Sequence, residues 1–274
     1  MDKTYVQLWS VRQDLEKDFI GTLKRIADIG YSGLEFAGNY GGYAAGELKK
    51  LLADMKLAPL SAHITSDNVA GHIDFAAELG LEYIIDPAAR IGNYEEAAAF
   101  SEKLNTAGKL CKDAGITFGY HNHRHEFMPC KDGTLMDTML KNTDPSLVCF
   151  QLDVGWSACA GMDNVAFINK YPGRFKLIHV KECSTEAGPE KPHDFSQYPK
   201  DENGWPILPP ELIRSFEEED SWNVALGKGL IDWKAIRDTA LPGGAEAFII
   251  EREYDYAGDV YQCLVEDWAF LRAL

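Results

Sequence analysis

The sequence predicts an α/β protein folded as a closed (β/α)8 TIM barrel in a single domain. Eight short runs rich in Val, Ile, Phe and Tyr alternate with longer runs whose apolar residues recur at helical spacing. No two of the eight runs are joined as a hairpin, which favours a parallel sheet. Eight such units in 274 residues match the usual size of this barrel.

The expected strands cover residues 5–11, 33–37, 58–64, 83–88, 116–123, 147–155, 175–182 and 247–254. The patterns between them, such as DFIGTLKRIADIG and NYEEAAAFSEKLNTAGKLCKDAG, end in a glycine that suits a helix C-terminus. A doubly wound open sheet is the alternative. It lacks support because no GxGxxG motif follows the first strand.

One connection is unusually long. Residues 183–225, here called the 183–225 segment, are rich in Pro, Asp, Glu and Ser and follow the seventh strand. A connection of this length is usually a functional lid or a disordered insert. We expect a lid over the end of the barrel where active sites form, with a short helix in PPELIRSFEEE.

Charge and hydropathy exclude several partners. A net charge of −16, from 27 basic and 43 acidic residues, repels nucleic acid. No apolar run approaches the ~20 residues of a membrane span. The N-terminus enters a strand pattern at once and leaves no room for a signal peptide, so we expect a cytoplasmic protein. The six cysteines contain no CxxC pair, and we expect them to be buried free thiols. A homo-oligomer is also compatible with the sequence.

Polar residues gather where the strands are expected to end. Parallel strands of a barrel point their C-terminal ends into one shared mouth. The candidates are Glu35, His63, Asp86, His121, His123, Asp153, His179, Lys181, Glu182, Glu251 and Glu253. Because buried charges are costly unless they are paired or bind a metal, so many at one end indicate a site. Carboxylates and imidazoles without a thiolate suit one divalent ion: Mn²⁺, Co²⁺, Zn²⁺, Fe²⁺ or Mg²⁺.

The chain resembles the xylose isomerase-like barrels known as sugar phosphate isomerases/epimerases, over residues 1–274. The resemblance rests on VQLWSVR, YHNHRHEF, LDVGW…AGMDNVAFINKYPGR, LIHVKE, LGKGLIDW and IIERE. It implies one divalent metal held by residues of the fifth to eighth strands. Asp153, His179 and Glu251 match three ligands of the family. The fourth is expected to be Glu126, because relatives that share YHNHxxEF keep this glutamate; His121 or His123 would be its substitutes.

The resemblance also implies chemistry on a small carbohydrate. An isomerase or epimerase acting on a sugar or keto-sugar through an enediolate is the leading expectation. Relatives often carry Glu where this chain has His121, and this change favours a lyase or dehydratase acting on a keto-sugar, keto-glycoside or keto-inositol as the alternative. A non-catalytic sugar-binding barrel is a third reading. An apurinic endonuclease is disfavoured by the charge.

Roles for individual residues follow. Imidazole titrates near neutral pH, so His121 or His123 is expected to transfer protons, with Glu251 and Lys181 as further catalytic groups. Strand alternation places residues 121 and 123 on the same side. For substrate binding we expect His63 and three aromatic side chains that can stack on a sugar ring: Trp9, Trp156 and Trp205.

Overall fold

The computed structural model describes residues 3–200, 206–253 and 258–274. Within these residues, eight parallel strands close into a barrel in the order β1-β10-β9-β8-β5-β4-β3-β2. The strands are β1 Tyr5–Gln7, β2 Gly33–Phe36, β3 Ala58–His63, β4 Tyr83–Asp86, β5 Thr117–His121, β8 Val148–Asp153, β9 Phe175–Val180 and β10 Ala247–Ile250. This confirms the single-domain TIM barrel and removes the open-sheet alternative.

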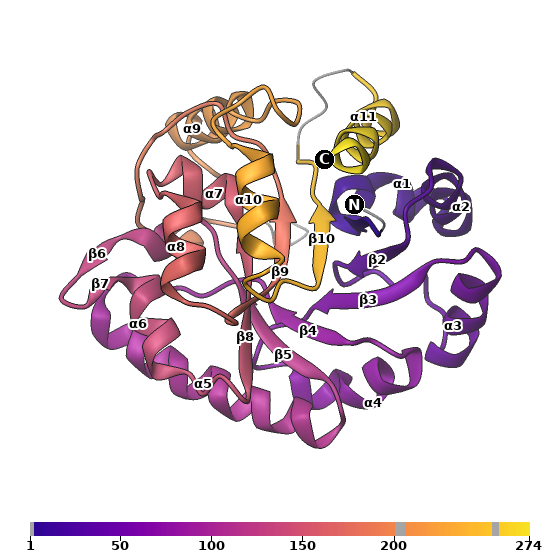
Figure 1. The fold of residues 1–274 in the computed structure, drawn as a ribbon, viewed down its shortest axis with the longest axis horizontal. Helices are drawn as coiled ribbons and strands as arrows, with labels where there is room; N and C mark the ends of the chain where they lie inside the picture. Colours follow the sequence, from indigo (N-terminus) through magenta and orange to yellow (C-terminus); the bar gives the residue numbers. More distant parts are fainter. Residues whose placement is uncertain (1–2, 201–205, 254–257) are drawn as a thin grey trace.

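Helices surround the strands (Figure 1). They are α1 Arg12–Lys17, α2 Phe19–Ile29, α3 Ala45–Asp54, α4 Val69–Leu79, α5 Tyr94–Asp113, α6 Leu135–Asn142, α7 Val154–Cys159, α8 Asn164–Lys170, α9 Pro210–Ser221, α10 Trp233–Ala240 and α11 Val260–Ala273. Apolar faces of these helices and the outward residues of the strands form one large core. None of the described helices is long and apolar enough to cross a membrane.

The strands are shorter than the sequence patterns suggest. The expected first strand, 5–11, ends at Gln7 because residues Leu8–Val11 form a 3-10 turn. The expected sixth strand ends at Asp153, whose side chain accepts a hydrogen bond from the backbone N–H of Trp156 and begins α7. A small antiparallel pair that was not predicted, β6 Pro129–Cys130 with β7 Gly133–Thr134, follows β5.

Alternation along each strand explains how a polar layer forms above an apolar one. Inside the barrel, a closed apolar cluster fills the layer at the beginning of the strands; it consists of Tyr5, Leu60, Tyr83, Ile85, Cys149, Leu177, Ala247 and Ile249. Two residues further along three of these strands, the side chains are Gln7, Gln151 and His179. On each of these strands, an inward-facing apolar residue of the core is therefore followed, two positions later, by an inward-facing polar residue of the site.

Candidate metal and catalytic site

Four buried side chains at the C-terminal ends of four strands bring their donor atoms together. His121, Asp153, His179 and Glu251 each offer one ligand atom, and these atoms lie within 4.8 Å of one another. His121 and Asp153 are the last residues of β5 and β8, His179 lies in β9, and Glu251 directly follows β10. The structure thus brings together three of the four ligands expected from the sequence, Asp153, His179 and Glu251.

Two atoms in this group lack hydrogen-bonding partners. Asp153 Oδ2 and His179 Nδ1 are buried, make no hydrogen bond to any residue that the structure describes, and lie 3.6 Å apart. Glu251 Oε2 lies 3.5 Å from the same nitrogen. Buried polar atoms without partners are costly, and a cation between them would satisfy both. These donors fit a divalent metal.

The electrostatics of the group also favour a positive charge. Burial lowers the pKa of His179, but the carboxylates of Glu251, Asp153 and Glu35 outweigh it and raise this pKa well above its usual value. Burial raises the pKa of Glu251, but His179 and Lys181 outweigh it and lower this pKa to about 2. The two carboxylates that face His179 Nδ1 make this position attractive to a cation.

Glu35 accepts a hydrogen bond from His179 on the side of the imidazole ring away from the donor group. Its Oε1 accepts hydrogen bonds from Gln7 Nε2 (2.7 Å) and His179 Nε2 (2.8 Å), and its Oε2 accepts from Ser61 Oγ (2.6 Å) and Gln151 Nε2 (2.7 Å). A carboxylate on the second nitrogen of an imidazole ligand fixes the ring and its tautomer. Glu35 therefore directs His179 Nδ1 at the donor group.

The same network sets the tautomer of His121. Gln151 donates its amide N–H to Glu35, so its Oε1 faces His121 Nδ1 at 2.9 Å and must accept from it. The proton of a neutral His121 is then on Nδ1, and Nε2 keeps its lone pair. Burial first, and then the neighbouring imidazoles of His179, His123 and His63, lower the pKa of His121 well below its usual value. His121 is thus a neutral donor with one free nitrogen.

Glu126 does not join this group. Its buried carboxylate accepts hydrogen bonds from the Tyr120 hydroxyl and from the His123 backbone N–H, the latter at 2.9 Å. It closes the turn after β5, and His121, five residues earlier, lies in the donor group instead. The family motif gave the residues but not which of them turns inward.

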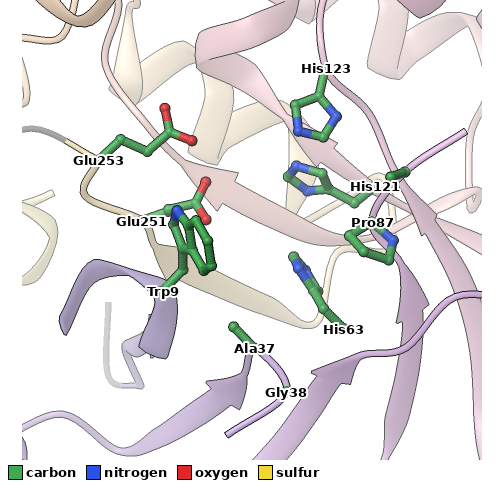
Figure 2. Close-up of a pocket in the computed structure, with 10 residues that line it drawn as sticks. Trp9, Ala37, Gly38, His63, Pro87, His121, His123, Glu251 and Glu253 are labelled. Carbon is green, nitrogen blue, oxygen red and sulfur yellow. The ribbon is translucent and has the colours of Figure 1, made fainter. Parts of the chain in front are cut away.

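The donor group opens into a cavity of about 410 Å³ (Figure 2). Its walls include the predicted residues Trp9, His63, His121, His123 and Glu251, together with Glu253. Figure 2 shows the three imidazoles on one side and Trp9, Glu251 and Glu253 on the other. Trp9 is 45% exposed and its ring lies under the guanidinium of Arg12, at 4.4 Å.

The remaining predicted residues lie around this cavity. Lys181 pairs with Glu253 and lies 4.1 Å above the ring of Trp156. Burial lowers the pKa of Lys181, but Glu253, Glu251 and Asp153 outweigh it and raise the pKa. Trp156 lines a neighbouring cavity. Trp205 lies outside the described residues.

Two carboxylates at strand ends, Asp86 and Glu182, accept hydrogen bonds mainly from backbone N–H groups of nearby loops. Asp86 accepts from the N–H groups of Ser66 (2.7 Å) and Ala88 (3.1 Å). Glu182 accepts from Gly227 N–H (2.9 Å) and Trp233 Nε1 (2.7 Å), which shapes the loop LGKGLIDW. Both were grouped with the site from their positions in the sequence, and in the structure their carboxylates accept these hydrogen bonds.

Sequence analysis missed the amide and hydroxyl groups of the network, Gln7, Ser61 and Gln151. The sequence contained an indication of this network. A glutamine inside an apolar strand needs a buried hydrogen-bonding partner. Gln7 and Gln151 also fall on the side of their strands that faces the site, by the alternation of side chains along a strand. Only the closed barrel shows that this partner is Glu35 in each case.

The family model described as "Xylose isomerase-like TIM barrel" matches residues 23–273. The chain belongs to this family. Among curated proteins, it is 28% identical over 199 residues to an inosose dehydratase of Clostridium beijerinckii, covering 63% of this chain and 66% of that protein. It is 22% identical over 212 residues to the inosose dehydratase of Geobacillus thermodenitrificans, covering 70% and 64%. The matches therefore span slightly less than two thirds of each relative's length.

Among solved structures, a sugar phosphate isomerase/epimerase from Parabacteroides distasonis is 27% identical with a TM-score of 0.75, and the match covers 100% of this chain and 94% of that one. These relatives of the xylose isomerase-like chain are named as enzymes, which agrees with the prediction of an enzyme. Their names divide between a dehydratase and an isomerase/epimerase, the two activities that the sequence leaves open.

Proposed function

We propose that this chain is a metal-dependent lyase that dehydrates a cyclic polyol ketone, a keto-sugar or keto-inositol. The enzyme would remove the proton on the carbon beside the carbonyl and release the hydroxyl of the next carbon as water. The observation that carries the proposal is the arrangement of the cavity. His121 and Glu251 of the four-residue donor group line it, with His123, which is outside that group, on one wall and Glu253, which pairs with Lys181, on the other.

In this proposal His121, Asp153, His179 and Glu251 hold the metal. When bound, the divalent ion supplies a Lewis acid for the carbonyl oxygen, which makes the neighbouring C–H more acidic. His121 replaces Glu126 as the fourth ligand, since His121 belongs to the group and, with Nδ1 facing Gln151, keeps the lone pair of its other ring nitrogen.

His123 is the proposed base. It lines the cavity next to His121, with the two ring centroids 5.0 Å apart, and burial lowers its pKa. Within the described residues its ring makes no hydrogen bond, so a ring nitrogen is available to take the proton of the C–H bond. The electron pair of that bond forms the C=C bond as the C–O bond of the leaving hydroxyl breaks.

The Lys181–Glu253 pair is the proposed acid. Glu253 lines the cavity opposite His123, and burial first, with Glu251 nearby, raises its pKa despite Lys181. A proton shared in this pair can pass to the departing oxygen, which then leaves as water. The pair thereby avoids release of a hydroxide ion.

Epimerisation is the second candidate. Glu251 and His123 lie on opposite walls of the cavity (Figure 2), so one could remove a proton and the other return it to the opposite face. The similarity to the sugar phosphate isomerase/epimerase supports this reading.

One experiment separates the two. The protein, loaded in turn with Mn²⁺, Co²⁺, Zn²⁺, Fe²⁺ or Mg²⁺, is incubated in D₂O with inososes and keto-hexoses and followed by NMR and ultraviolet absorbance. Dehydration gives an unsaturated ketone with a new absorbance band, and epimerisation gives a deuterated epimer without one. Absence of both deuterium uptake and product across the panel would contradict both candidates.

A further inference from the structure

Asn122 is buried between two residues of the site, His121 and His123, and is not among the described residues that line the cavity. Its side-chain amide binds the backbone of Asp153 at two points. Asn122 Oδ1 accepts a hydrogen bond from the Asp153 backbone N–H at 3.0 Å, and Asn122 Nδ2 donates to the Asp153 carbonyl oxygen at 3.3 Å. The same Nδ2 donates to the His123 carbonyl oxygen at 3.2 Å. One side chain thus connects the ends of β5 and β8.

These hydrogen bonds take the place of backbone pairing, which ends before Asp153. The paired residues of β5 and β8 run from Phe118–Val148 to His121–Gln151. Asp153 lies two residues beyond the last pair, although on its other side it is still paired with His179 of β9. The backbone of Asp153 is extended, and a primary amide offers the acceptor and the donor that match its N–H and C=O. Asn122 therefore completes the side of Asp153 that faces β5.

The contact bears on the donor group because His121 comes from β5 and Asp153 from β8. Asp153 Oδ1 already accepts from the Trp156 backbone N–H at 2.7 Å. With its backbone held by Asn122 and Oδ1 held by Trp156, Asp153 presents Oδ2 to His179 Nδ1. Metal sites require ligand distances to be correct within about 0.2 Å, so a small shift of β8 against β5 would disturb the site.

We propose that Asn122 is a positioning residue of the metal site: its amide sets the distance between Asp153 and His121 and thereby the shape of the donor group. Asn122 is not itself in that group and acts through the backbone of Asp153. This inference rests on the metal site of the proposed function, and it is independent of which reaction the site performs.

Cobalt binding tests this role, because the visible absorption spectrum of Co²⁺ depends on the number and geometry of its ligands. Asn122→Ala removes all three hydrogen bonds, and Asn122→Ser leaves one short hydroxyl in place of an amide with separate donor and acceptor. Each metal-free protein is titrated with Co²⁺. We expect both variants to bind Co²⁺ about 10–100-fold more weakly than wild type, the usual effect of losing a group that orients a ligand. Their spectra at saturation should also differ from that of wild type.

Asn105 of α5 provides the matched control. Its amide also binds backbone at two points: Oδ1 accepts from the Asp144 N–H at 2.8 Å, and Nδ2 donates to the Asn142 carbonyl oxygen at 3.1 Å. These residues lie outside the donor group and its cavity. Asn105→Ala should therefore unfold at a lower urea concentration than wild type but keep the Co²⁺ affinity and spectrum of wild type.

Circular dichroism first establishes that the variants are folded. Wild-type Co²⁺ affinity and spectrum in Asn122→Ala and Asn122→Ser would overturn the inference and leave Asn122 with a role in stability alone. An equal loss of affinity in Asn105→Ala would also overturn it. Because turnover is not the readout, a wild type that binds Co²⁺ but converts none of the ketones would reject the proposed reaction and not this inference. A wild type that binds no Co²⁺ would reject both.

Discussion

His121 and His123 are two residues apart, yet their surroundings give them different chemistry. His121 is buried, donates to Gln151 and belongs to the donor group. His123 lines the cavity, and the group that Glu126 binds is the backbone N–H of His123 rather than its ring. Their identical side chains are therefore proposed to act differently, one as a ligand and one as a base.

Glutamine substitutions test this division, because glutamine keeps much of the size and polarity but is a poor base. His121→Gln should lower the bound metal measured by elemental analysis. His123→Gln should keep the metal and lower turnover by about 10²-fold or more, the usual value of acid–base catalysis. Full activity of His123→Gln, or loss of its metal, would contradict the assignment.

A second pair of variants tests the ligand set. Asp153→Ala should remove the metal, because it deletes a charged donor that faces His179. Glu126→Gln should keep the metal and lower the free energy of unfolding by about 1–3 kcal/mol, since it disturbs buried hydrogen bonds to a charged group. Metal content and urea unfolding are measured on both proteins. Metal loss in Glu126→Gln with normal stability would restore Glu126 as a ligand.

The sequence predicted which residue types surround the site but not all of their directions. Asp153, His179 and Glu251 were expected from the resemblance to the family, and in the structure each continues the inward face of its own strand. Glu126 lies beyond the end of β5, where alternation no longer applies, and its direction depends on Tyr120. The partners of Glu35 come from strands far apart in the chain, so only barrel closure brings them together.

Single elements also depend on contacts that the local pattern does not show. α6 begins with a capping box in which Thr134 and Asp137 exchange hydrogen bonds. Asp137 Oδ1 further accepts from Lys170 Nζ (2.7 Å) at the end of α8 and from the Tyr171 hydroxyl (2.5 Å). One carboxylate thus fixes the start of one helix against the end of another. The shortened first and sixth strands have a similar cause, because turns and caps that follow them end the extended backbone.

Asp137 gives a pH-dependent prediction. Burial raises its pKa, but Lys170, Tyr171 and Thr134 outweigh this and lower it below 3.8. Since the folded pKa is depressed, the stabilisation is present above the unfolded value and is lost as pH falls through the folded one. Asp137→Asn should be less stable than wild type by about 1–3 kcal/mol at pH 7, and the gap should narrow below pH ~3.8. Urea unfolding of both proteins at pH 7 and pH 3 measures this difference in stability. A difference that does not change with pH would contradict the role of the Asp137 charge.

At the scale of the whole molecule, the 183–225 segment contributes none of the eight barrel strands but contacts the rest of the chain, through Ala187 and Gly188 on Cys159 and through Glu190 and Glu219 on Arg124. The segment, predicted to contain a helix, does so in α9. Its two ends meet where Ser184 N–H donates to Trp222 O at 2.9 Å and Cys183 bridges Asn223. Barrel closure involves none of its residues. That the segment is a lid remains a proposal, supported by its residues in the cavity that Trp156 and His123 line.

Replacing residues 186–220 with a short glycine-rich linker tests the lid. Because the ends already meet, the barrel should fold and keep its metal. KM for the substrate should rise, because the segment supplies walls of the cavity that Trp156 and His123 line. Metal content, circular dichroism and steady-state kinetics are compared with wild type. Parallel loss of metal and fold would show that the segment is structural.

The position of Glu35 has a consequence for how this protein can change over generations. Its carboxylate joins side chains from β1, β3, β8 and β9, so a substitution at any one of these positions alters the value of substitutions at the others. These positions should therefore show strong epistasis and accept new residues only in combination. The walls provided by residues 190–195 share none of these hydrogen bonds and can vary one residue at a time. A lineage of such enzymes could then acquire new substrates through the outer loop while its inner chemistry stays the same.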